Sequence, residues 1–478
     1  MNGKPGGLLR RRLPFITHHS SLIITPGCRM DHAPTLDPAA AAAPSPGVAS
    51  GGVRGVLRNR TFRSLQFRDY RLYFTGQIVS LTGSWMQSAA LMWLTYEQTR
   101  DPLWPPLMLV AQVGPTLVLG TWGGALADRF PRRRLILCTQ MAYLVNAAVL
   151  TALVASNFAG PWLLFAVQVA NGVIQSVDLP ARLAYVPSLV PRAALANAVA
   201  LNSMIFNAAR AVGPAAAGGL FWLAEYVVGT GLLPHSPPVT LGAVWCFTLN
   251  GLSFLVVIAA LQRISVDGAP ARAGGADARP GGEVWAGFRA VRADRRLLLL
   301  LAAAGGVSLF AWPALTLFPT YTDKALGHAE KEYAVLVSAL GAGALASAFL
   351  TATFGSEARR GLFLTVGAAA AAGGLLALSL AGGIVPAAAG AGLLGAGLIL
   401  HLSTGQSALQ LSVADDKRGR VMALWPMMLS ASSLVGQLVA GAAAQRLDVR
   451  HVMAGMAAGA AVTAAVVGWR AGRPTPTP

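Results

Sequence analysis

Long apolar blocks alternate with short basic clusters along most of the chain. Each block approaches the roughly 20 residues that an α-helix needs to cross a bilayer. The pattern predicts an all-α membrane protein with twelve transmembrane helices in two six-helix, pseudo-symmetric halves. The predicted spans lie near residues 72–96, 104–127, 135–156, 161–181, 197–224, 241–262, 297–320, 332–354, 362–382, 384–404, 421–444 and 450–470.

The segments between the blocks divide the chain. Residues 1–60 are rich in Ala, Pro, Gly and Arg and predict a disordered basic arm, within which Met30 offers an alternative start that would leave residues 1–29 untranslated. A polar linker at 263–295 separates the N-terminal half (61–262) from the C-terminal half (296–470), and residues 471–478 form a short tail. Residues 283–296 either form an interfacial helix or belong to an ordinary solvated linker, and the helix would carry Val284, Trp285, Phe288 and Val291 on one side.

Composition and charge agree with a membrane protein. Of the 478 residues, 54% are hydrophobic and only 12% are charged, so a water-soluble fold could not cover this chain with polar surface. A net charge of +18 would indicate nucleic-acid binding in a soluble protein, but the Lys and Arg residues lie between apolar blocks, where they set topology. The cysteines, Cys28, Cys138 and Cys246, are too far apart for a metal-ligand spacing or a disulfide framework.

The distribution of Lys and Arg predicts the orientation. If the N-terminus is inside, the inner loops between positions 129 and 473 hold twenty of these residues. The outer loops hold only five: Arg100, Lys324, Lys331, Arg446 and Arg450. The positive-inside rule therefore predicts a cell inner-membrane protein with both termini in the cytoplasm.

The loop after the second block carries the most specific motif. Residues 124–134 read GALADRFPRRR, in which small residues allow close helix packing and Asp128 can accept hydrogen bonds from a neighbouring helix N-terminus. This stretch resembles the loop signature G-x-L-A-D-R-x-G-R-[KR] of the major facilitator superfamily, with Pro131 in place of the usual Gly. The resemblance implies a cytoplasmic latch for the outward-open state, formed by Gly124, Asp128, Arg129, Arg132 and Arg133. The expected docking partner is the start of the eleventh span, after residues 415–420, and Arg182 is a further candidate partner of Asp128.

Other stretches of the sequence narrow the resemblance to one branch of this superfamily. Together they are similar to the bacterial efflux branch of enterobactin exporters and macrolide efflux proteins over about residues 62–470. They include residues 67–74 (FRDYRLYF), 83–87 (GSWMQ), 187–192 (PSLVPR), 206–210 (FNAAR) and 417–423 (KRGRVMA). Residues 209–218 (ARAVGPAAAG) partly match an antiporter pattern, which implies export, although Gly213 and Pro214 could serve helix packing alone.

Polar residues inside the spans are candidates for coupling or substrate contact, because a charge at mid-bilayer is costly. Arg210 falls near the middle of the fifth span, where it contacts substrate, couples conformations, or pairs structurally with Asn207 or Gln168. Asp178 is either a proton site or a helix-end carboxylate paired with Arg182. Gln168 stands where many proton-coupled members of the superfamily have Arg.

A cavity for an amphipathic molecule would be lined by aromatic and amide side chains. The candidates are Trp85, Gln87, Asn171, Gln175 and Trp312, although a Trp is equally suited to the membrane interface. The chain has no P-loop, HExxH or CxxC pattern, which argues against an enzyme. We expect no metal and no cofactor.

The sequence therefore predicts a proton-coupled exporter that moves a small amphipathic molecule by alternating access. A siderophore, a macrolide or another drug would fit this description. The expected partners are the small-molecule substrate, the proton gradient and membrane lipids, with no nucleic acid, and the protein is expected to be a monomer. A metabolite importer or uniporter of the same fold, and a non-transporting membrane scaffold or sensor, remain the alternatives.

Overall fold

A computed structural model describes residues 62–231, 237–268, 282–327, 330–354, 359–413 and 415–471. Within these ranges the chain forms α-helices and short 3-10 helices, with no strand. The predicted all-α class is confirmed. The predicted N-terminal arm, residues 1–60, lies outside the described residues.

The first half contains six long helices that follow one another with short connections. Proline residues stand in the first turn of several of them, where the missing backbone N–H is not needed. The helices are α2 (Arg68–Thr99), α3 (Trp104–Arg129), α4 (Arg132–Ala155), α5 (Pro161–Tyr185), α6 (Arg192–Gly229) and α7 (Pro238–Arg263).

The second half repeats this layout with one difference. Its first span is split into α9 (Arg295–Ala311) and α10 (Pro313–Leu326), because Pro313 has no backbone N–H to continue the helical ladder. Trp312 occupies the break, which the apolar pattern did not predict. The remaining helices are α11 (Glu330–Phe354), α12 (Arg360–Leu380), α13 (Ile384–Ser412), α14 (Asp415–Ala444) and α15 (Val449–Ala471).

A short helix, α8 (Gly282–Ala293), precedes the second half and packs against α9 and α14. This part of the linker is therefore helical up to Ala293, as the first of the two alternatives requires, while its placement at the membrane interface stays a prediction. Val291 is buried, whereas Phe288 on the same helix is half exposed. Asp294 then caps α9, since its carboxylate accepts hydrogen bonds from the backbone N–H groups of Arg296 (2.8 Å) and Leu297 (3.4 Å).

Eleven helical segments of the described chain are long and apolar enough to span a membrane, with α9 and α10 counted as one. Helix α2 has 32 residues but is more polar, and it supplies the twelfth span. It packs between α6 and α7, so Gln77, Ser80, Gln87 and Thr95 are buried against protein rather than lipid. The fold is thus the predicted twelve-helix, two-half arrangement.

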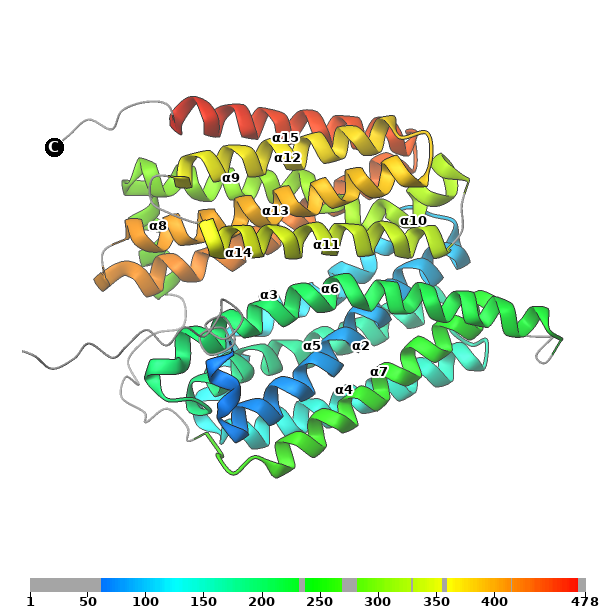
Figure 1. Ribbon diagram of the computed structural model, residues 1–478, viewed down its shortest axis with the longest axis horizontal. Coiled ribbons are helices and arrows are strands. Elements are labelled where there is room, and N and C mark those ends of the chain that lie inside the picture. Colours follow the sequence, from blue (N-terminus) through cyan, green and yellow to red (C-terminus); the bar gives the residue numbers. More distant parts are fainter. Residues whose placement is uncertain are drawn as a thin grey trace, which may run out of the picture. The chain divides into compact units, whose positions relative to one another are not determined.

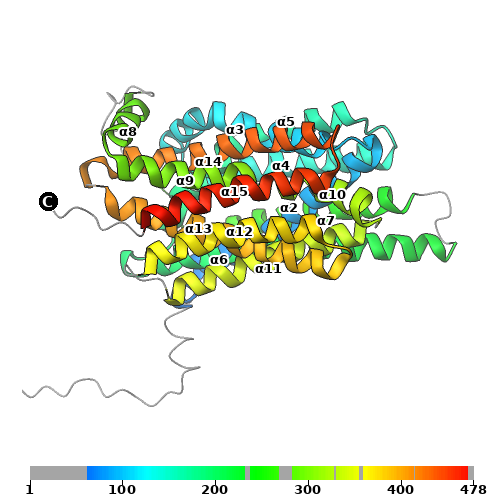
Figure 2. The same cartoon turned by 90° about the horizontal axis from the view of Figure 1, so that it is seen from above.

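Figure 1 draws α2–α7 as one group and α9–α15 as the other, with α6 and α11 facing each other between them. Figures 1 and 2 place α8 at the end of the bundle where α9 begins. This end also carries Arg129, Arg132, Arg133 and Arg263, and we call it the Arg-rich end. The other end, where α2 finishes and α3 begins, is called the opposite end.

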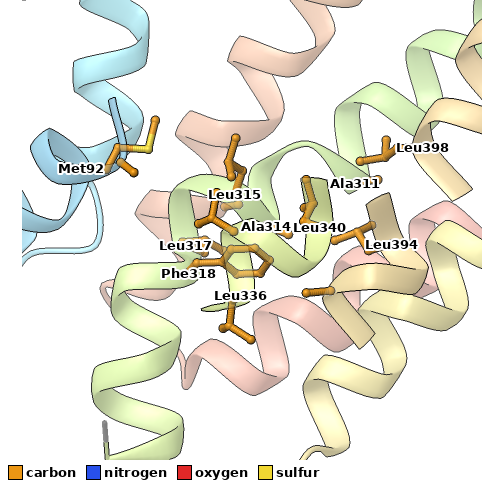
Figure 3. Close-up of a cluster of buried hydrophobic side chains, with 14 of the residues drawn as sticks. Met92, Ala311, Ala314, Leu315, Leu317, Phe318, Leu336, Leu340, Leu394 and Leu398 are labelled. Carbon is orange, nitrogen blue, oxygen red and sulfur yellow. The ribbon is translucent and has the colours of Figure 1, made fainter. Parts of the chain in front are cut away.

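Buried apolar side chains fill both halves and the contact between them. The largest cluster joins Met92 of α2 to Leu317 and Phe318 of α10 and to Leu336 and Leu340 of α11 (Figure 3). A second cluster around Tyr70 lies within the first half. The core therefore links the halves through α2, α10 and α11.

Candidate functional site

Polar side chains bond the two halves together at the opposite end. Asp323 of α10 accepts hydrogen bonds from the Tyr96 hydroxyl at 2.6 Å and from Nη1 of Arg100 at 3.1 Å. Between α2 and α3, the Asp101 carboxylate accepts from Nε2 of Gln445, just after α14, at 2.8 and 3.0 Å. We call these five residues the end clamp.

Further contacts between the halves lie next to the end clamp, nearer to the centre of the bundle. Tyr333 of α11 stacks on Trp93 of α2 with ring centroids 5.6 Å apart, and its hydroxyl lies 3.8 Å from the sulfur of Met92. Lys331 of α11 forms an ion pair with Glu225 of α6. The opposite end is therefore held by aromatic packing as well as by charge.

Glycine lets α6 and α11 approach backbone to backbone. A Cβ atom added at Gly341 of α11 would lie only 2.5 Å from the Cα of Ala211 in α6. Near the opposite end, a Cβ at Gly218 would lie 2.5 Å from the Cβ of Ala334. The two halves therefore touch along α6 and α11 from the level of Arg210 outward.

The carboxylate of the latch motif has no partner among the described residues at the Arg-rich end. Asp128, at the end of α3, is exposed and forms no hydrogen bond or ion pair with the described part of the chain. The side chains of 414–419, its expected partners at the start of α14, lie outside the described set. Arg182, the other candidate, pairs instead with Asp178, one turn earlier on α5.

Of the other latch residues, some are exposed to solvent and others bond to the first half. Arg129 is exposed, and a Cβ at Gly124 would meet no atom within 4 Å. Arg132 donates from Nη1 to the carbonyl of Ala184 at 3.0 Å.

Arg133 ties the linker to the end of α7. It donates from Nε to the Leu261 carbonyl at 2.7 Å and pairs through Nη1 with Asp267 at 2.8 Å. The start of the predicted linker is therefore bound to the first half.

Arg210 lies in an aromatic cage near the middle of α6. Its side chain is buried, and its guanidinium carbon is 5.2 Å from the ring centroid of Trp85, 5.4 Å from Phe206 and 5.1 Å from Trp312. Trp85 comes from α2, Phe206 is one turn earlier on α6, and Trp312 belongs to the other half. We call these four residues the arginine cage.

No carboxylate of the described chain pairs with Arg210, and its Nε is buried without a hydrogen-bond partner there. Neither Gln168 nor any other described side chain bonds to it, and the side chain of Asn207 lies outside the described set. Close packing holds the cage, because a Cβ at Gly213 would lie 2.6 Å from the Cβ of Trp85. Pro214, which follows it, is buried.

A second buried polar cluster surrounds Asp178 within the first half. Its Oδ2 lies 2.5 Å from Nε of Arg182, and its Oδ1 accepts from Thr139 at 2.6 Å and from Gln140 at 3.0 Å. Arg182 also donates from Nη1 to Gln77 of α2 at 2.5 Å. The cluster therefore joins α2, α4 and α5 around one ion pair.

The predicted cavity residues are not all brought together. Trp85 and Trp312 meet at the arginine cage, whereas Gln87 accepts a hydrogen bond from Asn250 of α7 at 2.8 Å and so faces the interior of the first half. Asn171 and Gln175 are half-buried on α5. Phe206, the third aromatic residue of the cage, stands four residues before Arg210, and this spacing is a sequence signal for it, since such residues share a helix face.

The chain matches the family described as Transmembrane secretion effector, part of the major facilitator superfamily, over residues 59–474. Its relatives include the staphyloferrin A transporter of Staphylococcus aureus (strain NCTC 8325 / PS 47), 26% identical over 38% of this chain and 45% of that transporter. Macrolide efflux protein A of Streptococcus pyogenes is 22% identical over 81% of this chain and 93% of that protein. The chain thus spans less than half the length of the first of these relatives.

Solved structures share the fold. A bacterial homologue of the human lysosomal transporter Spinster, in an inward-facing and unoccupied conformation, superposes with a TM-score of 0.63 at 14% identity, covering 86% of this chain and 99% of that one. A bacterial homologue of the iron transporter ferroportin, inward-facing, gives a TM-score of 0.59 at 15% identity over 85% and 99%. All these proteins are transporters, in agreement with the prediction that the chain is not an enzyme. This chain belongs to the Transmembrane secretion effector family of the major facilitator superfamily.

Proposed function

We propose that this protein exports a small amphipathic molecule by alternating access. The observation that carries the proposal is the uneven closure of the two halves around a buried charge. The end clamp and the α6–α11 contact close the opposite end, while the latch carboxylate Asp128 at the Arg-rich end is exposed. Alternating access requires a substrate site between the halves that is reached from one side of the membrane at a time.

The orientation follows from the charge of the two ends. Because Lys and Arg concentrate at the Arg-rich end, we place this end in the cytoplasm and the chain in the bacterial inner membrane. In this orientation the arginine cage is reached from the cytoplasm, as an exporter needs for loading. The names of the relatives, a siderophore transporter and a macrolide efflux protein, support a substrate of that kind.

We assign proton coupling to Asp178. It is the only carboxylate side chain buried within the described part of the chain, and reversible protonation is the simplest way to link transport to a proton gradient. Protonation would weaken its ion pair with Arg182 and loosen the contact among α2, α4 and α5. The buried pair then couples a proton to the packing of the first half.

We assign the latch role to Asp128 in the other transport state. When the halves close at the Arg-rich end, its carboxylate would meet the N-terminus of α14, whose backbone N–H groups carry partial positive charge. Its exposure in the present state agrees with a latch that is released while this end is open.

Everted membrane vesicles from cells that express the chain test the proposal. After energisation by respiration, we expect uptake of a labelled siderophore, and a protonophore should abolish it. Uptake only into right-side-out vesicles would identify an importer, and uptake that ignores the protonophore would refute proton coupling. No movement of any tested compound, at a normal membrane content of the protein, would favour a scaffold or sensor.

A further inference from the structure

We infer that the arginine cage is an anion-binding subsite and that the transported molecule is an amphipathic organic acid. The inference rests on the proposed transport function and adds the charge of the substrate. It starts from the unpaired guanidinium of Arg210, which belongs to the substrate path because Trp312 brings the second half to it.

The cage stabilises the cation without neutralising it. Aromatic faces attract a guanidinium group, but they supply no net negative charge, and a buried ion without a counter-ion is unfavourable. Arg210 is 5% exposed, and its Nε has no partner among the described residues. An incoming anion would supply the missing charge.

The shape of the cage indicates which anion. A guanidinium group presents planar, paired N–H donors that match the two oxygens of a carboxylate. Trp85, Phe206 and Trp312 surround it with apolar rings. A carboxylate attached to an apolar or aromatic body would bond to the guanidinium and pack against the rings.

One ring of the cage is exposed on the side that faces the Arg-rich end. Phe206 lies one turn from Arg210 in that direction and is 41% exposed, although its ring contacts both Arg210 and Trp85. The other side is closed where Gly341 meets Ala211. A molecule entering from the Arg-rich end would therefore reach the phenyl ring first and the guanidinium next.

The surrounding charges disfavour a cationic substrate. Asp178, the one buried carboxylate of the described chain, is already bonded to Arg182, Thr139 and Gln140 inside the first half. The cage itself carries the positive charge of Arg210. A cation would meet repulsion with no described carboxylate to offset it.

Binding of three matched probes to the full chain in lipid nanodiscs tests the inference. The probes are 2-naphthoate, its neutral primary amide and 2-naphthylmethylammonium, measured by equilibrium dialysis. We expect the naphthoate to bind at least tenfold more tightly than the amide, and the ammonium to bind most weakly. Arg210→Gln should weaken naphthoate binding at least tenfold and change amide binding less than twofold.

Two further variants separate the effect of the Arg210 guanidinium on binding from a general effect on the structure. Arg210→Lys keeps the charge without the planar fork and should give intermediate naphthoate affinity. Arg263 is exposed at the end of α7, so the control variant Arg263→Gln should leave the affinities for all three probes unchanged. Equal affinity for the acid and the amide, no saturable naphthoate binding, or an equal loss for all probes in Arg210→Gln would each overturn the inference.

The outcome is separable from that of the proposed function. Proton-driven efflux in everted vesicles, without any preference for the acid in nanodiscs, would leave the exporter standing and refute the anion subsite. A tenfold preference for the acid that depends on Arg210, without any transport in vesicles, would support the subsite and refute the exporter.

Discussion

Asp323 joins the halves through two interactions, and its replacement tests whether the opposite end is a gate. Asp323→Asn keeps the size of the side chain and removes its charge. The ion pair with Arg100 is lost, and the hydrogen bond from Tyr96 then ends on a neutral amide oxygen. Both changes weaken only the state in which this end is closed.

The magnitude follows from the exposure of the partners. The side chains of Arg100 and Asp323 are 54% and 30% exposed, so their ion pair contributes about 0.5 kcal/mol. Tyr96 is fully buried, and loss of charge assistance weakens its bond by about 1 kcal/mol. The sum of about 1.5 kcal/mol corresponds to a roughly tenfold shift toward the state that is open at this end.

Pulsed electron paramagnetic resonance can measure this shift. Spin labels at Gln98 and Lys324, both exposed and one in each half, report the distance across the opposite end. The labels require a background in which Cys28, Cys138 and Cys246 are replaced by Ser. We expect the population of long distances to rise roughly tenfold relative to the short ones, as the energy difference implies.

Asp267→Asn provides a matched control. It removes an ion pair with Arg133 of 2.8 Å, but that pair joins the linker to the first half at the Arg-rich end. The distance across the opposite end should therefore not change. If both variants shift the distribution equally, or if neither does, the end clamp is not specific to one transport state.

The remaining predictions concern the latch, the buried ion pair and the α6–α11 contact. Asp128→Asn should reduce efflux in everted vesicles at least tenfold without changing the amount of protein in the membrane; normal efflux would contradict the latch role. Asp178→Asn should lower thermal stability in detergent strongly, since breaking a buried pair costs about 3–5 kcal/mol. Addition of Arg182→Gln should recover part of the loss, and a double variant less stable than the single would disprove the pairing argument. Gly341→Ala should slow transport because its Cβ would meet the α6 backbone, whereas Gly219→Ala, where a Cβ meets no atom within 4 Å, should not; equal effects would refute the close-contact role.

The spans could be predicted from the sequence because each helix must by itself be long and apolar enough to cross the bilayer. A helix that crosses the membrane needs a minimum length of apolar residues whatever its neighbours are, and its flanking charges are set by the two aqueous sides. Helix α2 was the least apolar case, and its polar residues are tolerated because protein surrounds them. The break at Trp312 was missed since the apolar run continues through Pro313.

The local pair of Asp178 and Arg182 was also within reach, because residues four apart on a helix face each other. The same reasoning could have added Phe206 to Arg210. Partners that are distant in the sequence could not be predicted in this way. Gln87 bonds to Asn250, 163 residues away, which no spacing along the chain indicates.

Tertiary structure alone decided which polar groups from distant parts of the chain meet. A helix that is apolar all round gives no periodic signal for the side that faces lipid, its own half or the other half. The arginine cage therefore appears only when α2, α6 and the α9–α10 break are packed together, with Trp85 and Trp312 coming from different halves. The sequence by itself determined the twelve spans and the family, because these follow from local constraints, whereas the cage and the end clamp depend on how the two halves pack.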